Sequence, residues 1–85
     1  MKKVRVVKLE ELKEAQTPNN KEVGYFKEGL FERDPKVGEE FLLYREFGEN
    51  KVRIPIWHTS LVTEILSSDT FKTKNSIYKI ISLTD

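Results

Sequence analysis

Cysteine is absent from this chain, and glycine and proline are scarce, at four and three of 85 residues. A chain without thiols forms no disulfide and no thiolate zinc site, so the disulfide framework of small secreted domains is excluded. No apolar run approaches the roughly 20 residues of a membrane-spanning helix. The run that follows Met1 is interrupted by Arg5 and Lys8, which does not suit a signal peptide. We therefore expect a cytoplasmic protein that makes no membrane contact.

A large charge excess of either sign is also missing. Fifteen Lys and Arg residues stand against 14 Asp and Glu residues, for a net charge of +1. Residues 1–21 hold six basic and three acidic side chains, residues 22–50 hold four and eight, and residues 51–85 hold five and three. Proteins that bind phosphate backbones usually carry a stronger basic excess. We read the pattern as a mixed surface whose acidic middle offers Glu39 and Glu40 as candidate protein contacts.

Length and hydrophobicity predict one folded domain over residues 1–85. Hydrophobic residues make up 38% of the chain, which with the low net charge excludes a disordered chain. A chain this short has no room for a second core. Leu9, Leu12 and Ala15 recur at helical spacing, so we expect one short helix near residues 9–16. The Thr-Pro-Asn-Asn sequence at 17–20 should then form a turn.

Beyond this segment the chain is typical of short β-strands separated by turns. In residues 52–57, Val52, Ile54 and Ile56 alternate with other residues, and Pro55 predicts an edge position or a bulge. Other strands are expected at residues 4–9, 23–26, 30–31, 40–45, 61–66, 71–73 and 77–83. Turns are expected at residues 28–29, 34–38, 47–50 and 67–70. The fold class predicted is all-β, as a small SH3-like antiparallel barrel.

Groups suited to catalysis or metal binding do not gather in the sequence. His58 is the single histidine, with no acidic residue close in sequence to orient it. The adjacent acidic pairs at 10–11 and 39–40 would place one carboxylate on each face of a strand, which does not suit a two-carboxylate site. No serine lies in a nucleophile motif, and the glycines form no phosphate-binding loop. We expect no enzyme, no metal and no cofactor.

Hydroxyl and amide side chains are concentrated in the last third of the chain. If residues 67–70 close a hairpin without a bulge, Leu66 lies opposite Phe71 and Glu64 opposite Thr73. Further along the same register Thr59 lies opposite Tyr78, and Ser60 opposite Ile77. One interpretation is a polar binding rim with two flat aromatic surfaces. The other is that these side chains satisfy backbone groups at strand ends. The candidate binding residues are Trp57, Thr59, Ser60, Thr73, Asn75, Ser76 and Tyr78.

The same segment resembles a known pattern. Residues 59–65 (TSLVTEI) and 71–78 (FKTKNSIY) are similar to T-S-x-V-x-x-I … F-x-T-x-N-S-x-Y, found in small uncharacterised proteins of bacteriophages and other mobile elements. The match covers about a quarter of the chain, with a weak likeness at residues 37–41. The resemblance implies a compact β-barrel and a phage or mobile-element origin, and it implies no activity.

Three functions fit these observations. The leading hypothesis is a non-catalytic protein that binds a host or viral protein, in its sharpest version as an inhibitor of a host defence system. The alternative is a barrel that binds single-stranded nucleic acid through Trp57, Tyr78 and the lysines and arginine near them. The third is a binder of a small molecule or nucleotide. A homodimer is expected, because pairing increases the burial of a small barrel.

Overall fold

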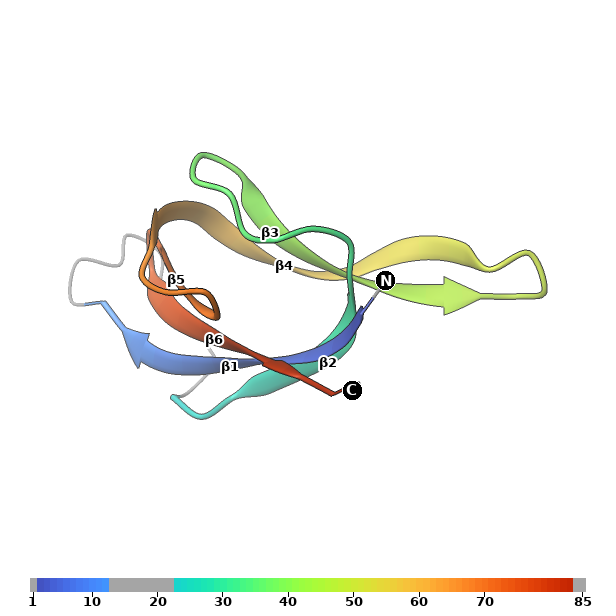
Figure 1. The fold of residues 1–85 in the computed structure, drawn as a ribbon, viewed down its shortest axis with the longest axis horizontal. Coiled ribbons are helices and arrows are strands. Elements are labelled where there is room, and N and C mark those ends of the chain that lie inside the picture. The colour runs from blue at the N-terminus through green and yellow to red at the C-terminus, as the bar shows by residue number, and fades with distance from the viewer. Residues whose placement is uncertain (1, 13–22, 84–85) are drawn as a thin grey trace.

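Antiparallel strands follow one another around a closed barrel in the computed structural model, which describes residues 2–12 and 23–83 (Figure 1). The strands are β1 (Lys2–Glu11), β2 (Phe26–Phe31), β3 (Glu40–Phe47), β4 (Val52–Ile65), β5 (Thr70–Thr73) and β6 (Ser76–Ser82). Each strand pairs with its neighbour in sequence, and β1 also pairs with β6 to close the barrel. This confirms the predicted all-β class and is consistent with a small SH3-like barrel.

Strand β1 shows how pairing overrides a helical spacing. Val4, Val6 and Lys8 alternate on the inner face and are buried. The strand continues through a bulge at Leu9 to Glu11, which pairs with Ser76 of β6. The expected helix near residues 9–16 is therefore wrong for residues 9–11, because a ladder with β6 satisfies their backbone groups. Residues 13–16 of that helix, and the turn expected at 17–20, lie outside the described residues.

Strand β2 runs without interruption through Gly29, where a turn was expected. A Cβ at Gly29 would lie 3.1 Å from the Tyr44 carbonyl oxygen and 3.2 Å from the Leu43 Cβ. The glycine therefore allows β3 to approach β2 closely, which is a common reason for glycine within a strand. The turn predicted at residues 28–29 is wrong. The strand predicted at 23–26 is also wrong for residues 23–25, because Val23 and Gly24 form a turn and β2 begins at Phe26.

Strands β3 and β4 form a long hairpin, which Figure 1 shows extending away from the barrel. The molecule measures 44 × 24 × 24 Å as a consequence. The separate strands predicted at residues 52–57 and 61–66 are one strand, β4. Leu43 pairs with Trp57 while Tyr44 pairs with Pro55, so the register shifts at this point and leaves Ile56 between the two pairs. The predicted bulge beside Pro55 is confirmed.

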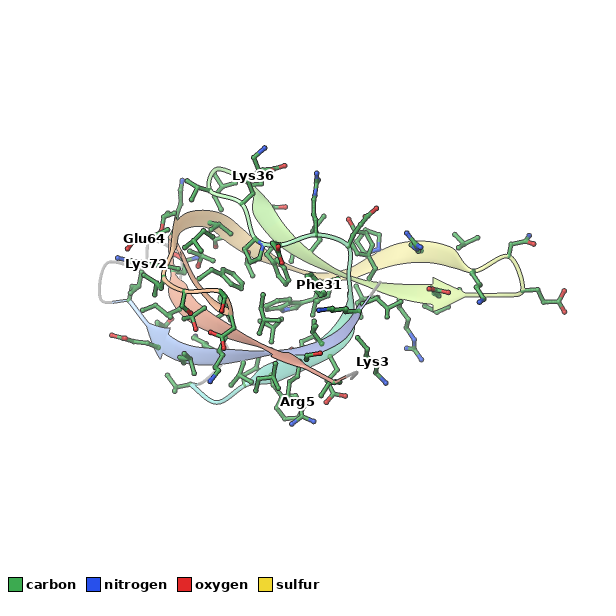
Figure 2. The ribbon with its side chains drawn as sticks, in the orientation of Figure 1. Lys3, Arg5, Phe31, Lys36, Glu64 and Lys72 are labelled. Atoms are coloured by element: carbon green, nitrogen blue, oxygen red, sulfur yellow. The ribbon has the colours of Figure 1, made fainter. Side chains whose placement is uncertain are left out.

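The core lies inside the barrel and combines valine and leucine side chains with a row of aromatic rings. Rings of Phe31, Phe41, Phe71 and Tyr78 follow one another, with centroids 6.5, 5.1 and 5.6 Å apart. In Figure 2, Phe31 points inward while Arg5 and Lys36 extend outward. The buried hydrophobic residues are Val4, Val6, Phe41, Leu43, Val62, Phe71 and Tyr78.

Candidate functional site

The predicted rim lies on β4, β5 and β6, but the strands pair in a different register from the one expected. Phe71 pairs with Ile65, so the ladder is already shifted by one residue at the β4–β5 turn. A bulge at Thr63 shifts it by one residue more, and Thr73 pairs with Val62. Strand β5 then ends, and β6 returns along β5 and β1. Tyr78 pairs with Phe71 and Lys8, so the predicted pairing of Thr59 with Tyr78 is wrong, as is that of Ser60 with Ile77.

Two of the predicted rim residues close the turn between β5 and β6. The Thr73 hydroxyl accepts hydrogen bonds from the backbone N–H of Asn75 (3.2 Å) and of Ser76 (3.1 Å), and it donates one to the Ser76 carbonyl (3.1 Å). Thr73 and Ser76 are both buried. Their hydroxyl groups therefore lie inside the barrel, and Thr73 satisfies backbone groups as the structural interpretation expected.

Side-chain hydrogen bonds also connect this turn to β4. The Asn75 side-chain amide donates to the Ser60 hydroxyl at 2.6 Å. The neighbouring Thr59 hydroxyl donates to the Ser60 carbonyl at 2.7 Å and accepts from the Phe41 N–H at 3.1 Å. The two parts of the T-S … N-S pattern are thus joined in space. This explains why polar residues occur at these positions without requiring a ligand.

Trp57, Thr59, Ser60 and Tyr78 meet at a surface pocket of about 290 Å³. Its other lining residues are Tyr25, Glu40 and His58, so sequence reasoning missed Tyr25 as a site residue. The rings of Trp57 and Tyr78 stand edge to face, with centroids 5.5 Å apart and planes 82° apart. Tyr78 is only 4% exposed, so it forms the floor of the pocket and offers no open ring face. Trp57 and Tyr25 also line the pocket and are half-buried.

Carboxylates that looked unpaired in sequence have partners in the fold. Glu40 lies on β3 beside β4, and its Oε1 is 3.6 Å from His58 Nδ1. Glu39 Oε1 lies 3.7 Å from Arg33, and its Oε2 lies 3.9 Å from Lys36. His58 therefore does have an acidic neighbour, contrary to the expectation from sequence. The contact joins residues that are 18 positions apart, and only the β3–β4 register brings them together.

A buried lysine lies next to this pocket's floor. Lys8 is fully buried on β1, directly opposite Tyr78 of β6, and its Nζ lies 3.8 Å from Glu11 Oε1. Burying an ammonium group is costly unless it is paired, so this ion pair compensates its charge. The sequence carried a signal for this position, because Lys8 follows Val4 and Val6 on the inward face of a period-two strand.

A second surface feature is the end of the β3–β4 hairpin. Opposed residues of antiparallel strands share a face, so the pairs Phe47–Val52 and Arg45–Ile54 place these four side chains together. The Arg45 guanidinium lies 5.4 Å from the centre of the Phe47 ring. Phe47, Val52 and Ile54 are 43%, 55% and 45% exposed. No residue here was selected from sequence as a binding residue.

Two features are absent from the described part of the chain. No group of three or more His, Cys, Asp or Glu side chains there could hold a metal ion. In residues 2–12 and 23–83 there is also no helix with the length and apolar character to cross a membrane.

Fold and surface together define a small closed antiparallel β-barrel with one aromatic pocket and one projecting hairpin. No known protein family, curated protein or solved structure matches the chain. Functional inference therefore rests on the chemistry of these two features.

Proposed function

We propose that this chain is a non-catalytic binding protein whose projecting hairpin contacts a partner protein. In keeping with the phage and mobile-element resemblance, the partner proposed is a host or viral protein, in the sharpest version a component of a host defence system. The observation that carries the proposal is the exposure of Phe47, Val52 and Ile54 on one face of the hairpin. Contiguous exposed apolar side chains on a small protein mark interaction surfaces.

The hairpin face is an extension of the barrel's inner face. Phe41 and Leu43 of β3 point into the core, and Arg45 and Phe47 follow at the same period of two. Inside the barrel these positions are covered by other strands, whereas the outer part of the hairpin pairs only with itself among the described residues. A partner surface placed on it would complete a two-layer packing like that of the barrel interior.

Charge on this face indicates the chemistry of the partner. Arg45 is the charged residue among the four side chains of the face. Glu46 and Arg53 are register partners on the opposite face of the hairpin. The partner expected is therefore an apolar patch bordered by at least one carboxylate, which would meet Arg45. Glu39 and Glu40, which the sequence suggested as protein contacts, are weaker candidates for contacting the partner. Both carboxylates already have a cationic or imidazole neighbour within the chain.

The test compares capture of host or phage proteins by the wild-type chain and by a double variant, Phe47→Ser with Ile54→Thr. The proposal expects reproducible capture by the wild type and loss of that capture by the double variant, with an unchanged melting temperature. A matched control, Val37→Thr with Ile81→Thr, alters two other exposed apolar residues and should retain capture. Equal capture by both double variants, or none by the wild type, would overturn the proposal.

Single-stranded nucleic acid is the weaker candidate. The nucleic-acid hypothesis required bases to stack on the rings of Trp57 and Tyr78. The ring of Tyr78, however, is packed against those of Phe71 and Trp57 and is nearly inaccessible. Titration of the chain with short single-stranded oligonucleotides at low salt should leave Trp57 fluorescence unchanged.

A further inference from the structure

The pocket on the barrel offers a site that is independent of the hairpin. From its lining we infer that the pocket binds a quaternary ammonium group, which would lie between the rings of Trp57 and Tyr25 and beside the Glu40 carboxylate. The ring of Tyr78 closes the pocket beneath. Aromatic faces attract cations through the negative potential above the ring, and tryptophan does so most strongly.

The charges around the pocket favour a cation. Glu40 is the acidic lining residue, and no lysine or arginine lines the pocket. Lys8, a fully buried cation, lies opposite Tyr78, and its Nζ is 3.8 Å from Glu11 Oε1, which compensates its charge. The ring of His58 lies beside the Glu40 carboxylate, with Nδ1 3.6 Å from Oε1. Glu40 is therefore the carboxylate that a cationic ligand would meet among the lining residues.

The hydrogen-bonding groups of the pocket favour an alkylated ammonium over a primary one. The Thr59 hydroxyl already donates to the Ser60 carbonyl and accepts from Phe41, and the Ser60 hydroxyl already accepts from Asn75. A primary ammonium would need an acceptor for each of its N–H groups to replace the water it loses, and the lining residues offer it one carboxylate. A quaternary ammonium has no N–H to satisfy, so contact with ring faces and one carboxylate is sufficient.

Two sources could supply this group, a free choline-like metabolite or the trimethylated lysine of a partner protein. The full chain should be titrated at about pH 8 with tetramethylammonium, choline and a trimethyllysine peptide, at constant ionic strength set with potassium chloride. Trp57 is the single tryptophan, so its fluorescence reports on the pocket directly. We expect saturable changes with dissociation constants of about 1–10 mM for the small cations. If the trimethyllysine peptide binds more tightly than choline, the source of the group is a partner protein. If the two bind equally, the source is a free metabolite.

Matched controls separate the cation from general hydrophobic binding. The neutral choline isostere 3,3-dimethyl-1-butanol should produce no saturable change. Glu40→Gln should weaken tetramethylammonium binding roughly 5- to 10-fold, whereas Glu39→Gln, at the adjacent carboxylate outside this pocket, should leave it unchanged. Both variants change exposed or half-buried side chains, and equal melting temperatures would show that both are folded. Binding of the neutral isostere, equal weakening by the two variants, or no saturation by any cation would overturn the inference.

Discussion

The inner and outer parts of the β3–β4 hairpin present apolar side chains on the same face and have opposite environments. In the inner part, Phe41 and Leu43 are 3% and 0% exposed within the barrel. In the outer part, Phe47 and Ile54 continue the same face and remain exposed. The alternating direction of side chains along a strand therefore specifies which residues share a face. The strands packed on that face decide whether those residues are buried.

The barrel part of this pair of strands contributes buried area and aromatic contacts to folding, whereas the projecting part leaves apolar side chains exposed. Substitutions in the barrel should therefore change the free energy of unfolding, and those on the hairpin face should change it little. On the proposed function, substitutions on the hairpin face should change binding instead. Two pairs of variants compare the regions directly, and two further predictions concern the barrel alone.

The largest effect is expected from matched phenylalanines in the two regions. Phe71 is fully buried and its ring centroid lies 5.1 Å from that of Phe41, whereas Phe47 is on the exposed hairpin face. Phe71→Ala should lower the free energy of unfolding by about 3–5 kcal/mol, enough to unfold many small domains. Phe47→Ala should lower it by less than about 1 kcal/mol. Urea denaturation of both variants measures these free energies. An equal loss of unfolding free energy in the two variants would contradict the distinction between barrel and hairpin.

Glycines provide the second comparison. Gly29→Ala places a Cβ against the Tyr44 carbonyl and Leu43, so overpacking should cost about 1–3 kcal/mol. Gly48, in the hairpin turn, has a φ of +73° and open space around it. Gly48→Ala should cost about 1 kcal/mol from backbone conformation alone. At Gly48, asparagine should lower the melting temperature less than alanine does. At Gly29, asparagine should lower it more than alanine does. Thermal unfolding of the four variants measures both differences. The same order at both sites would contradict this account.

The hydrogen bond between Asn75 and Ser60 should have a smaller effect. Asn75→Ala and Ser60→Ala should each cost about 1 kcal/mol, and a double-mutant cycle should give a coupling of roughly 0.5–1.5 kcal/mol. Ser67→Ala, at an exposed turn on the same hairpin, is the control and should not couple to Asn75. A coupling near zero for Asn75 and Ser60 would mean that the contact seen at 2.6 Å contributes nothing to stability.

The smallest effect concerns acid stability at the β4–β5 turn. Hydrogen bonds from the Ser67 and Thr70 hydroxyls lower the pKa of Asp69 in the folded chain. A carboxylate whose pKa is depressed by folding contributes stability above its unfolded value of about 4, and that contribution is lost as pH falls through the folded value. Asp69→Asn should therefore flatten the loss of melting temperature over this acidic range. An unchanged pH profile would show that the turn does not depend on the ionised form.

Local sequence chemistry determined much of this fold. Period-two alternation predicted a strand at residues 52–57. Pro55 predicted an edge position or a bulge there, because a proline cannot donate a ladder hydrogen bond, and the bulge is found. The interpretation that polar side chains in this segment satisfy backbone groups is confirmed for Thr73, but the turn that follows it was not predicted. The absence of cysteine excluded disulfides directly. These properties depend on near neighbours in the chain, which is why they could be read from it.

Only the tertiary structure decided register, burial and the composition of the two surfaces. A one-residue shift at the β4–β5 turn and the bulge at Thr63 together moved Thr73 from Glu64 to Val62. The pairing of β1 with β6 drew Leu9–Glu11 out of a helical pattern. Glu40 and His58 meet because β3 pairs with β4, and Phe47 stays exposed because no described strand covers it. Each outcome depends on contacts between residues far apart in sequence, whose energies no local pattern contains.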